Sequence, residues 1–154
     1  MNEFILGIDP GPVNCGYGLL ENNKYVDAGV LRNEGDRLID QLGIIMNQAN
    51  LIAVEGFRYQ GKRVAVNDII ATCQIIGMVK GLACAKGLPV IELMSSEWRS
   101  LLFIPKGADD NFIREKAEKL LRYKFNFKNK TEAKNYHHAV EACAIALAAE
   151  RRGK

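Results

Sequence analysis

The sequence of 154 residues lacks several features that define common classes of protein. Its four cysteines are scattered and form no C-x-x-C pair, and its two histidines are adjacent, so no zinc-binding pattern is present. The longest uncharged apolar run, residues 69–79, is far shorter than the roughly 20 residues that cross a bilayer. We therefore expect reduced thiols and no membrane span.

Other absences bear on domain organisation and location. We find no internal repeat and no linker, and domains usually have about 100 to 150 residues, so we expect one domain over residues 1–154. The first apolar stretch, residues 4–8, has no basic residue before it and is too short for a signal-peptide core. We therefore expect a cytoplasmic location. A content of 48% hydrophobic and 25% charged residues is typical of globular proteins and excludes a disordered chain.

Strand and helix patterns alternate along the chain and predict an α/β fold. The turn-rich break at residues 22–24 suits an antiparallel connection. We therefore expect a three-stranded antiparallel meander plus parallel strands in one mixed sheet, flanked by helices. Gly77 and Gly81 are expected to thin their helix for close packing. The expected strands are 4–8, 16–21, 25–31, 51–55 and 90–93. The expected helices are 36–49, 66–86, a short one around Trp98, 109–121 and 135–149. We expect Ser95 and Ser96 to cap the short helix and Asn135 to cap the last one.

Two carboxylates stand where predicted buried strands end. Asp9 closes one apolar stretch, and Glu55 closes another just before a glycine. Packing does not explain these acids, because a buried charge is costly unless a partner or a metal balances it. The alternative for Asp9 is a turn aspartate before Pro10-Gly11.

The last predicted helix adds two further candidate ligands. His138 and Glu141 are three residues apart and share a helix face, although the neighbouring His137 is an alternative to His138. A histidine without any ligand role is the other alternative. Three carboxylates and an imidazole at one sheet edge would suit Mg²⁺ or Mn²⁺. These ions activate water and stabilise a departing oxyanion, so the pattern favours phosphodiester hydrolysis.

Basic residues gather in two segments, which favours contact with nucleic acid. Residues 119–130 hold five cations, no acid and three aromatic residues, a mixture suited to phosphate contact and base stacking. The alternative is a solvated helix end whose aromatic rings pack inward. The second cluster directly follows Glu55. The candidates for DNA contact are Lys119, Arg122, Lys124, Lys128 and Lys130, with Tyr123, Phe125 and Phe127 between them, then Arg58, Lys62 and Arg63 beside Phe57 and Tyr59, and finally the loop residue Lys106.

Three motifs occur in order along almost the whole chain. They are Gly7-Ile8-Asp9-Pro10-Gly11 followed by Gly16-Tyr17-Gly18, then Ala53-Val54-Glu55, then residues 138–146 with His138 and Glu141. Their order and spacing resemble the RuvC-type Holliday junction resolvases, and are far more specific than any one motif. Gln74-Ile75-Ile76-Gly77 also resembles part of that family's dimer-forming helix.

The resemblance implies an RNase H-like fold and a homodimer, here through Val66–Lys86, that cuts two opposed strands of a four-way DNA junction. In the two-metal scheme one ion activates the attacking water and the other stabilises the leaving 3′-oxygen. By resemblance Asp9 would bridge the two Mg²⁺ or Mn²⁺ ions, Glu55 and Glu141 would complete separate shells, and His138 would bind a metal or orient the water.

The chain departs from the family pattern at two positions. Glu141 replaces the usual aspartate, and Cys15 stands where the first motif usually has threonine. Both departures affect the expected metal geometry. Phe57 and Tyr59 are both candidates for the aromatic residue that inserts near the junction centre in this family.

The sequence is also compatible in part with three other functions. The Asp-x-Gly after the first strand also resembles the phosphate loop of actin-like and Hsp70-like ATPases, but 154 residues leave no room for their second lobe. A structural junction-binding protein with an inactive site would accommodate both departures. An RNase H-type nuclease acting on RNA–DNA hybrid would need the same carboxylates.

Overall fold

Five strands form one mixed sheet in the order β3-β2-β1-β4-β5. The computed structural model describes residues 2–59, 61 and 63–153. The first two pairings, β1 with β2 and β2 with β3, are antiparallel, whereas β1 with β4 and β4 with β5 are parallel. The predicted meander and parallel strands are both present. The strands are β1 (Phe4–Asp9), β2 (Asn14–Glu21), β3 (Lys24–Arg32), β4 (Leu51–Gly56) and β5 (Val90–Met94).

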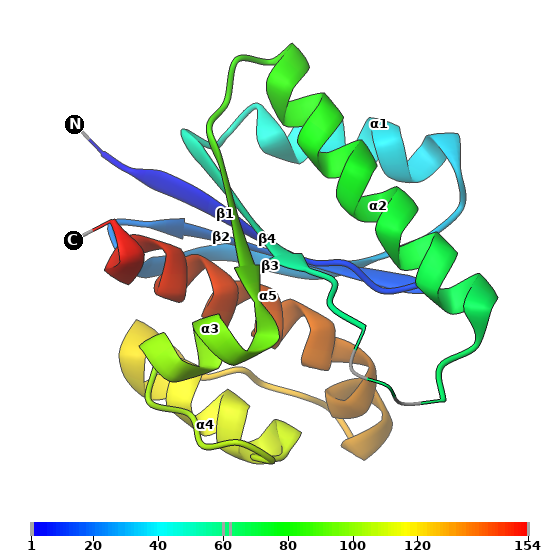
Figure 1. Ribbon diagram of the computed structural model, residues 1–154. Coiled ribbons are helices and arrows are strands. Elements are labelled where there is room, and N and C mark those ends of the chain that lie inside the picture. The colour runs from blue at the N-terminus through cyan, green and yellow to red at the C-terminus, as the bar shows by residue number, and fades with distance from the viewer. Residues whose placement is uncertain (1, 60, 62, 154) are drawn as a thin grey trace.

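Helices cover both faces of the sheet (Figure 1). One layer holds α1 (Asp36–Met46) and α2 (Val66–Ala85), and the other holds α3 (Ser95–Leu101), α4 (Asp110–Leu121) and α5 (Lys130–Arg152). Each layer buries its own apolar cluster against the sheet. Burial on both faces explains why β1 and β4 are continuous apolar runs rather than alternating ones.

The carboxyl ends of three parallel strands meet at one edge of the sheet. Asp9 ends β1, Glu55 lies at the end of β4, and β5 leads directly into α3. Glu55 is paired with Leu93 on β5 in the parallel register. Ligand sites of open α/β sheets lie at this edge. The topology therefore brings both strand-end acids and the start of α3 to one place.

Glycines on β1 and β2 let α5 lie unusually close to the sheet. A Cβ atom at Gly7 would come within 1.9 Å of the Ala142 carbonyl oxygen, and one at Gly16 within 2.1 Å of the His138 carbonyl oxygen. Both contacts are with backbone, so no side-chain rotation could relieve them. The close approach sets His138 and Glu141 beside the end of β1.

We expect Gly16→Ala to destabilise the protein by about 1–3 kcal/mol, since overpacking of a close contact costs that much. The added methyl group would push the α5 backbone away at His138. Denaturant unfolding measures the effect. Gly43→Ala on α1 is the matched control, because a methyl group there meets no atom within 4 Å and should gain about 0.5–1 kcal/mol of helix propensity. Equal stability changes in the two variants would contradict this account.

The final helix begins earlier than the sequence suggested. The Asn129 side chain accepts a hydrogen bond from the backbone N–H of Glu132 at 2.9 Å, and α5 follows from Lys130. Asn135 lies inside the helix, so its predicted role as the cap is wrong. Both asparagines satisfy the local rule for caps, so that rule alone does not choose between them.

The short helix α3 also begins differently from the prediction. Met94 precedes the helix, and its backbone N–H donates to the Glu97 carboxylate at 2.8 Å. Ser95 and Ser96 are therefore the first helical residues and not its caps. The reciprocal contact from Glu97 replaces the hydroxyl cap that the serines predicted.

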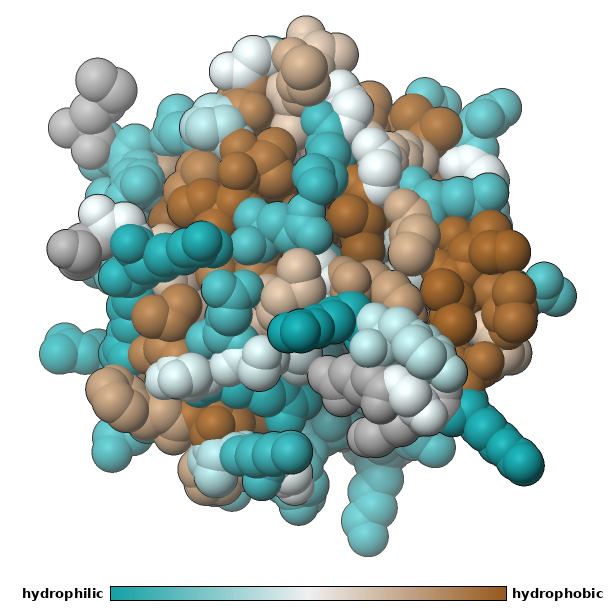
Figure 2. Space-filling view, viewed as in Figure 1, coloured by the Kyte–Doolittle hydropathy of each residue, from teal (hydrophilic) through white to brown (hydrophobic). Residues whose placement is uncertain are grey.

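The rest of the chain covers α2 only in part. The helix buries Ile75, Ile76, Val79 and Ala83, but Ile70 is 50% exposed. Figure 2 shows an apolar patch on the side of the molecule where the first half of α2 runs. The apolar residues of α2 thus surround the helix, rather than forming the single broad face that the sequence predicted.

Gly77 and Gly81 lie on the uncovered part of α2. A methyl group at either position would meet no atom within 4 Å. The prediction that these glycines serve close packing is therefore wrong within a single copy of the chain. Any element that uses their small size must come from outside the described residues.

By length and composition α2 also passes the test for a membrane-crossing helix. It is the one helix among the described residues to do so, and 22% of its apolar window is buried. The expectation of no such segment came from the uncharged run at residues 69–79, which ends before Lys80. The mean hydropathy over a longer window remains high despite this charge. One such helix is weak evidence for a membrane span, and α2 packs on the sheet as part of a layered fold.

Candidate metal centre

Asp9 lies at the centre of a cluster of potential metal ligands. It is buried, with 4% of its surface exposed. Its Oδ2 atom is 2.7 Å from Nδ1 of His138. Ligand atoms of Asp9, His138 and Glu141 all lie within 4.8 Å of one another. The structure thus brings together three of the four residues that the sequence nominated.

Glu55 approaches the same cluster from β4. Its charge acts on both Asp9 and Glu141, although its carboxylate is outside the group of three within 4.8 Å. Its Oε1 atom accepts a hydrogen bond from the indole Nε1–H of Trp98 at 3.0 Å. No local sequence pattern indicated Trp98 as a partner of Glu55. Its position could have been inferred from the strand before it: β5 is parallel to β4, so the residues after β5 start at the same sheet edge as Glu55.

The cluster holds more acid than its own cations balance. Burial raises the pKa of Asp9 well above its usual range, and repulsion from Glu55 raises it further. Burial raises the pKa of Glu141 to about 8, with repulsion from Asp9 and Glu55 opposed by Arg99. Burial lowers the pKa of His138 and so disfavours its cationic form. Buried carboxylate oxygens are the ligands that hard divalent cations prefer. A divalent cation would also balance the negative charge of these acids when they are ionised.

Arg99 on α3 is the second residue that sequence reasoning missed. Its guanidinium Nη2 lies 3.6 Å from Oε1 of Glu141. Its Nε atom is buried and has no hydrogen-bond partner among the described residues. Arg99 and Trp98 are consecutive, so one helix contacts two of the candidate carboxylates.

The structure distinguishes between the two histidines. The His138 ring points to Asp9, whereas Nδ1 of His137 contacts the backbone carbonyl of Lys134. Burial lowers the pKa of His138, and its Nδ1 atom lies within hydrogen-bond distance of the Asp9 carboxylate. His138 is therefore the histidine of the cluster.

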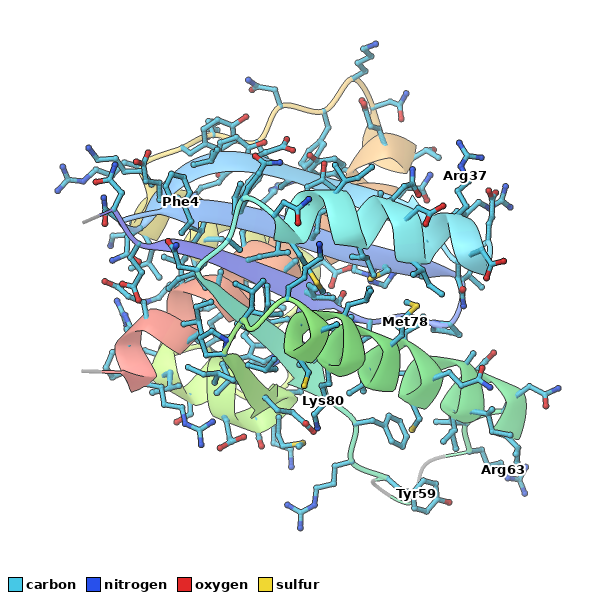
Figure 3. The ribbon with its side chains drawn as sticks, turned by 90° about the horizontal axis from the view of Figure 1, so that it is seen from above. Phe4, Arg37, Tyr59, Arg63, Met78 and Lys80 are labelled. Atoms are coloured by element: carbon cyan, nitrogen blue, oxygen red, sulfur yellow. The ribbon has the colours of Figure 1, made fainter. Side chains whose placement is uncertain are left out.

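The loop after β4 carries the second basic segment. Phe57 is half-buried against the core under α1 and α2, whereas Tyr59 is 64% exposed. Arg58 and Arg63 are exposed as well. Figure 3 shows Tyr59 and Arg63 on the loop that leads into α2. Lys62, also predicted to contact DNA, lies outside the described residues.

The aromatic residues of the 119–130 segment pack inward, which was the alternative to base stacking. Tyr123 stacks on Tyr25 with ring centroids 3.8 Å apart, and Phe125 is buried. The rings of Phe127 and Tyr136 are 5.6 Å apart. The cations remain available to solvent. The exposed cations are Lys119, Arg122, Lys124, Lys128 and Lys130, together with Lys106 of the α3–α4 loop.

Two clefts adjoin the cluster. One, of about 580 Å³, lies between α4 and α5 and includes Glu141 in its wall. The other, of about 200 Å³, includes Glu55. Each cleft also has basic residues suited to phosphate contact. These are Arg114, Lys130 and Lys134 in the larger cleft, and Arg58 in the smaller one.

Solved structures of Holliday junction resolvases share this RNase H-like architecture. The structure of T. thermophilus RuvC in complex with Holliday junction substrate superimposes with a TM-score of 0.76 at 17% identity, over 98% of this chain and 94% of that chain. The Fowlpox virus resolvase with its substrate Holliday junction DNA gives 0.53 at 12% identity, over 97% and 99%. The predicted fold class is thus confirmed.

Residues 5–148 match the family model described as crossover junction endodeoxyribonuclease RuvC. The chain belongs to this family of divalent-metal-dependent nucleases of DNA recombination, which resolve Holliday junctions. The RuvC of Saccharopolyspora erythraea is 25% identical over 158 residues, covering 93% of this chain and 74% of that relative. The resemblance found in the three sequence motifs is therefore confirmed.

Proposed function

We propose that this chain resolves four-way DNA junctions by paired, metal-dependent nicks centred on Asp9. The clustering of Asp9, His138 and Glu141 within 4.8 Å, in a member of the RuvC family, carries the proposal. Three other inferences accompany it. Each site binds two Mg²⁺ ions, for which Mn²⁺ can substitute. The chain forms a homodimer, and it is located in the cytoplasm.

Each residue of the cluster has a distinct part in this proposal. Asp9 would contribute to both ion sites, because its carboxylate interacts with Glu55 on β4 and with Glu141 on α5. His138 orients the Asp9 carboxylate through their 2.7 Å contact. A bound divalent cation supplies Lewis-acid stabilisation and a water of lowered pKa. Binding it requires Asp9 and Glu141 to release the protons that burial favours.

The two clefts support a path for the DNA across the cluster. One strand would pass from the Glu55 side to the Glu141 side, with its phosphates near Arg58 and Lys130. Exposed Tyr59 is better placed than half-buried Phe57 to enter a junction. The other exposed cations would add contacts to the DNA arms that carry no sequence information.

Exposed residues of α2 support a homodimer. They recur every three or four positions along one side of the helix, where two glycines would allow close approach of a second copy. These residues are Val66, Ile70, Cys73, Gly77, Gly81 and Cys84. Family members cut two opposed strands, so a pair of sites would match the symmetry of the junction.

Ile70→Lys is expected to weaken dimerisation roughly a hundredfold, because an unpaired charge buried in an interface costs several kcal/mol. Sedimentation velocity over a range of concentrations measures the change. Val26→Lys on β3 is the matched control, since Val26 is 42% exposed and lies far from α2 in the sheet order. A wild-type chain that sediments only as a monomer would refute the dimer.

A cleavage competition between substrates tests the proposed function. Labelled four-way junction is incubated with Mg²⁺ and an excess of unlabelled junction, flap, RNA–DNA hybrid or linear duplex. We expect junction to compete best and to be nicked in two opposed strands. Preferential cutting of hybrid would favour an RNase H-type enzyme, and binding of junction without any metal-dependent nick would favour a structural protein.

A further inference from the structure

Trp98 is a core residue whose indole N–H group makes a hydrogen bond that packing alone would not require. It is fully buried on α3 and belongs to the apolar cluster on the α5 side of the sheet. A phenylalanine or leucine could also occupy such a position. An indole brings a buried N–H, which must be hydrogen-bonded or cost free energy. The partner here is Oε1 of Glu55, at 3.0 Å.

The surroundings hold this indole in place. The guanidinium carbon of Arg99 lies 5.0 Å from the Trp98 ring centroid, within cation–π range. The parallel register of β4 and β5 places Gly56 opposite Met94, so α3 starts immediately beside the end of β4. The donor is therefore fixed relative to Glu55 by the sheet itself.

We propose that Trp98 is a positioning residue that fixes the Glu55 carboxylate for divalent-metal binding. This inference rests on the proposed function, because it takes Glu55 as a metal ligand. The indole occupies one carboxylate oxygen and sets the plane of the group. Hydrogen-bonded partners of ligating residues usually change metal affinity or activity by about 10- to 100-fold.

Trp98→Phe removes the N–H donor and retains an aromatic ring in the core. We expect the Mg²⁺ concentration for half-maximal junction cleavage to rise about tenfold or more. The maximal rate should largely return at saturating Mg²⁺, because Glu55 itself is unchanged. A raised half-saturating concentration would distinguish positioning from a general loss of stability.

Leu42→Ala is the control for stability. Leu42 is fully buried on α1, in the cluster on the other side of the sheet. Its truncation should lower the melting temperature without changing the half-saturating Mg²⁺ concentration. If Trp98→Phe also leaves that concentration unchanged, or lowers only the maximal rate, the positioning role is overturned.

A second measurement uses the unaltered core and does not depend on the folding of Trp98→Phe. Trp98 is the only tryptophan of the chain, so 5-fluorotryptophan labelling gives a single ¹⁹F resonance. We expect this resonance to shift on Mg²⁺ titration in the wild type, and the shift to be lost in Glu55→Gln. A resonance that ignores Mg²⁺ at concentrations that support cleavage would overturn the inference.

Different results would refute the proposed function and the role of Trp98. If the wild type shows neither Mg²⁺-dependent cleavage nor a Mg²⁺-dependent resonance, the proposed function fails and takes this inference with it. If the wild type cleaves with Mg²⁺ while Trp98→Phe has the same metal dependence, the proposed function stands and the role of Trp98 alone is wrong.

Discussion

Asp9→Asn should reduce junction cleavage about a thousandfold or more while leaving junction binding nearly unchanged. Metal ions stabilise the transition state by several kcal/mol, and each 1.36 kcal/mol corresponds to a factor of ten in rate. The substitution removes the charge at the centre of the cluster but keeps the shape of the side chain. The exposed cations that we propose contact DNA phosphates are untouched.

Single-turnover cleavage and a gel-shift titration, both in Mg²⁺, measure the two quantities separately. Asp27→Asn is the matched control, because Asp27 is an exposed acid on β3 that contacts the Tyr17 hydroxyl. It should cleave at close to the wild-type rate. Wild-type cleavage by Asp9→Asn would remove Asp9 from the proposed metal site.

The metal-free protein should lose stability as the pH rises from 6.5 to 8. The pKa of Glu141 increases from 4.5 in the unfolded chain to about 8 in the folded one. Between these values the folded state binds more protons than the unfolded state, so raising the pH favours unfolding. The raised pKa of Asp9 acts in the same direction. Each pKa unit corresponds to about 1.4 kcal/mol.

The window from pH 6.5 to 8 reports mainly on the carboxyl groups. The pKa of His138 is lowered from 6.5, so its opposite effect on stability is about half complete at pH 6.5 and nearly complete about one pH unit above it. Thermal melts in a chelator should therefore show a falling melting temperature, and Mg²⁺ should restore it at pH 8 by binding the folded state. Glu141→Gln should melt higher than the wild type at pH 8 without metal.

The exposed acid Asp40 on α1 provides the comparison for this experiment. Asp40→Asn should retain the wild-type fall in melting temperature between pH 6.5 and 8, because it lies outside the acidic cluster. A melting temperature that is constant or rises over this window in the metal-free wild type would contradict the electrostatic account of the site.

The pattern of the sequence predicted the order of the elements and nominated the acids. Buried strands such as β1 and β4 are continuous apolar runs, and each ends in a carboxylate that packing does not explain. Parallel pairing then brings Asp9 and Glu55 to one edge. Helical spacing put His138 and Glu141 on one face, and the structure turns that face to Asp9.

Tertiary contacts determined what the sequence did not reveal. The partners Trp98 and Arg99 are separated by about 40 residues from the carboxylates they contact, so no local pattern joins them. The choice between His137 and His138 depends on how α5 rotates over the sheet. The close backbone contacts at Gly7 and Gly16 fix that rotation. The positions of these glycines in the sequence do not by themselves give the rotation angle of the helix.

The central claim is that Asp9, Glu55, His138 and Glu141 together bind divalent cations. Crystals soaked in Mn²⁺ test it most directly, because anomalous scattering locates the ions without reference to activity. We predict manganese peaks at the edge of the sheet, in contact with Asp9 and shared by the acids on β4 and α5. Crystals that bind Mn²⁺ elsewhere, with no anomalous peak beside Asp9, would contradict the account.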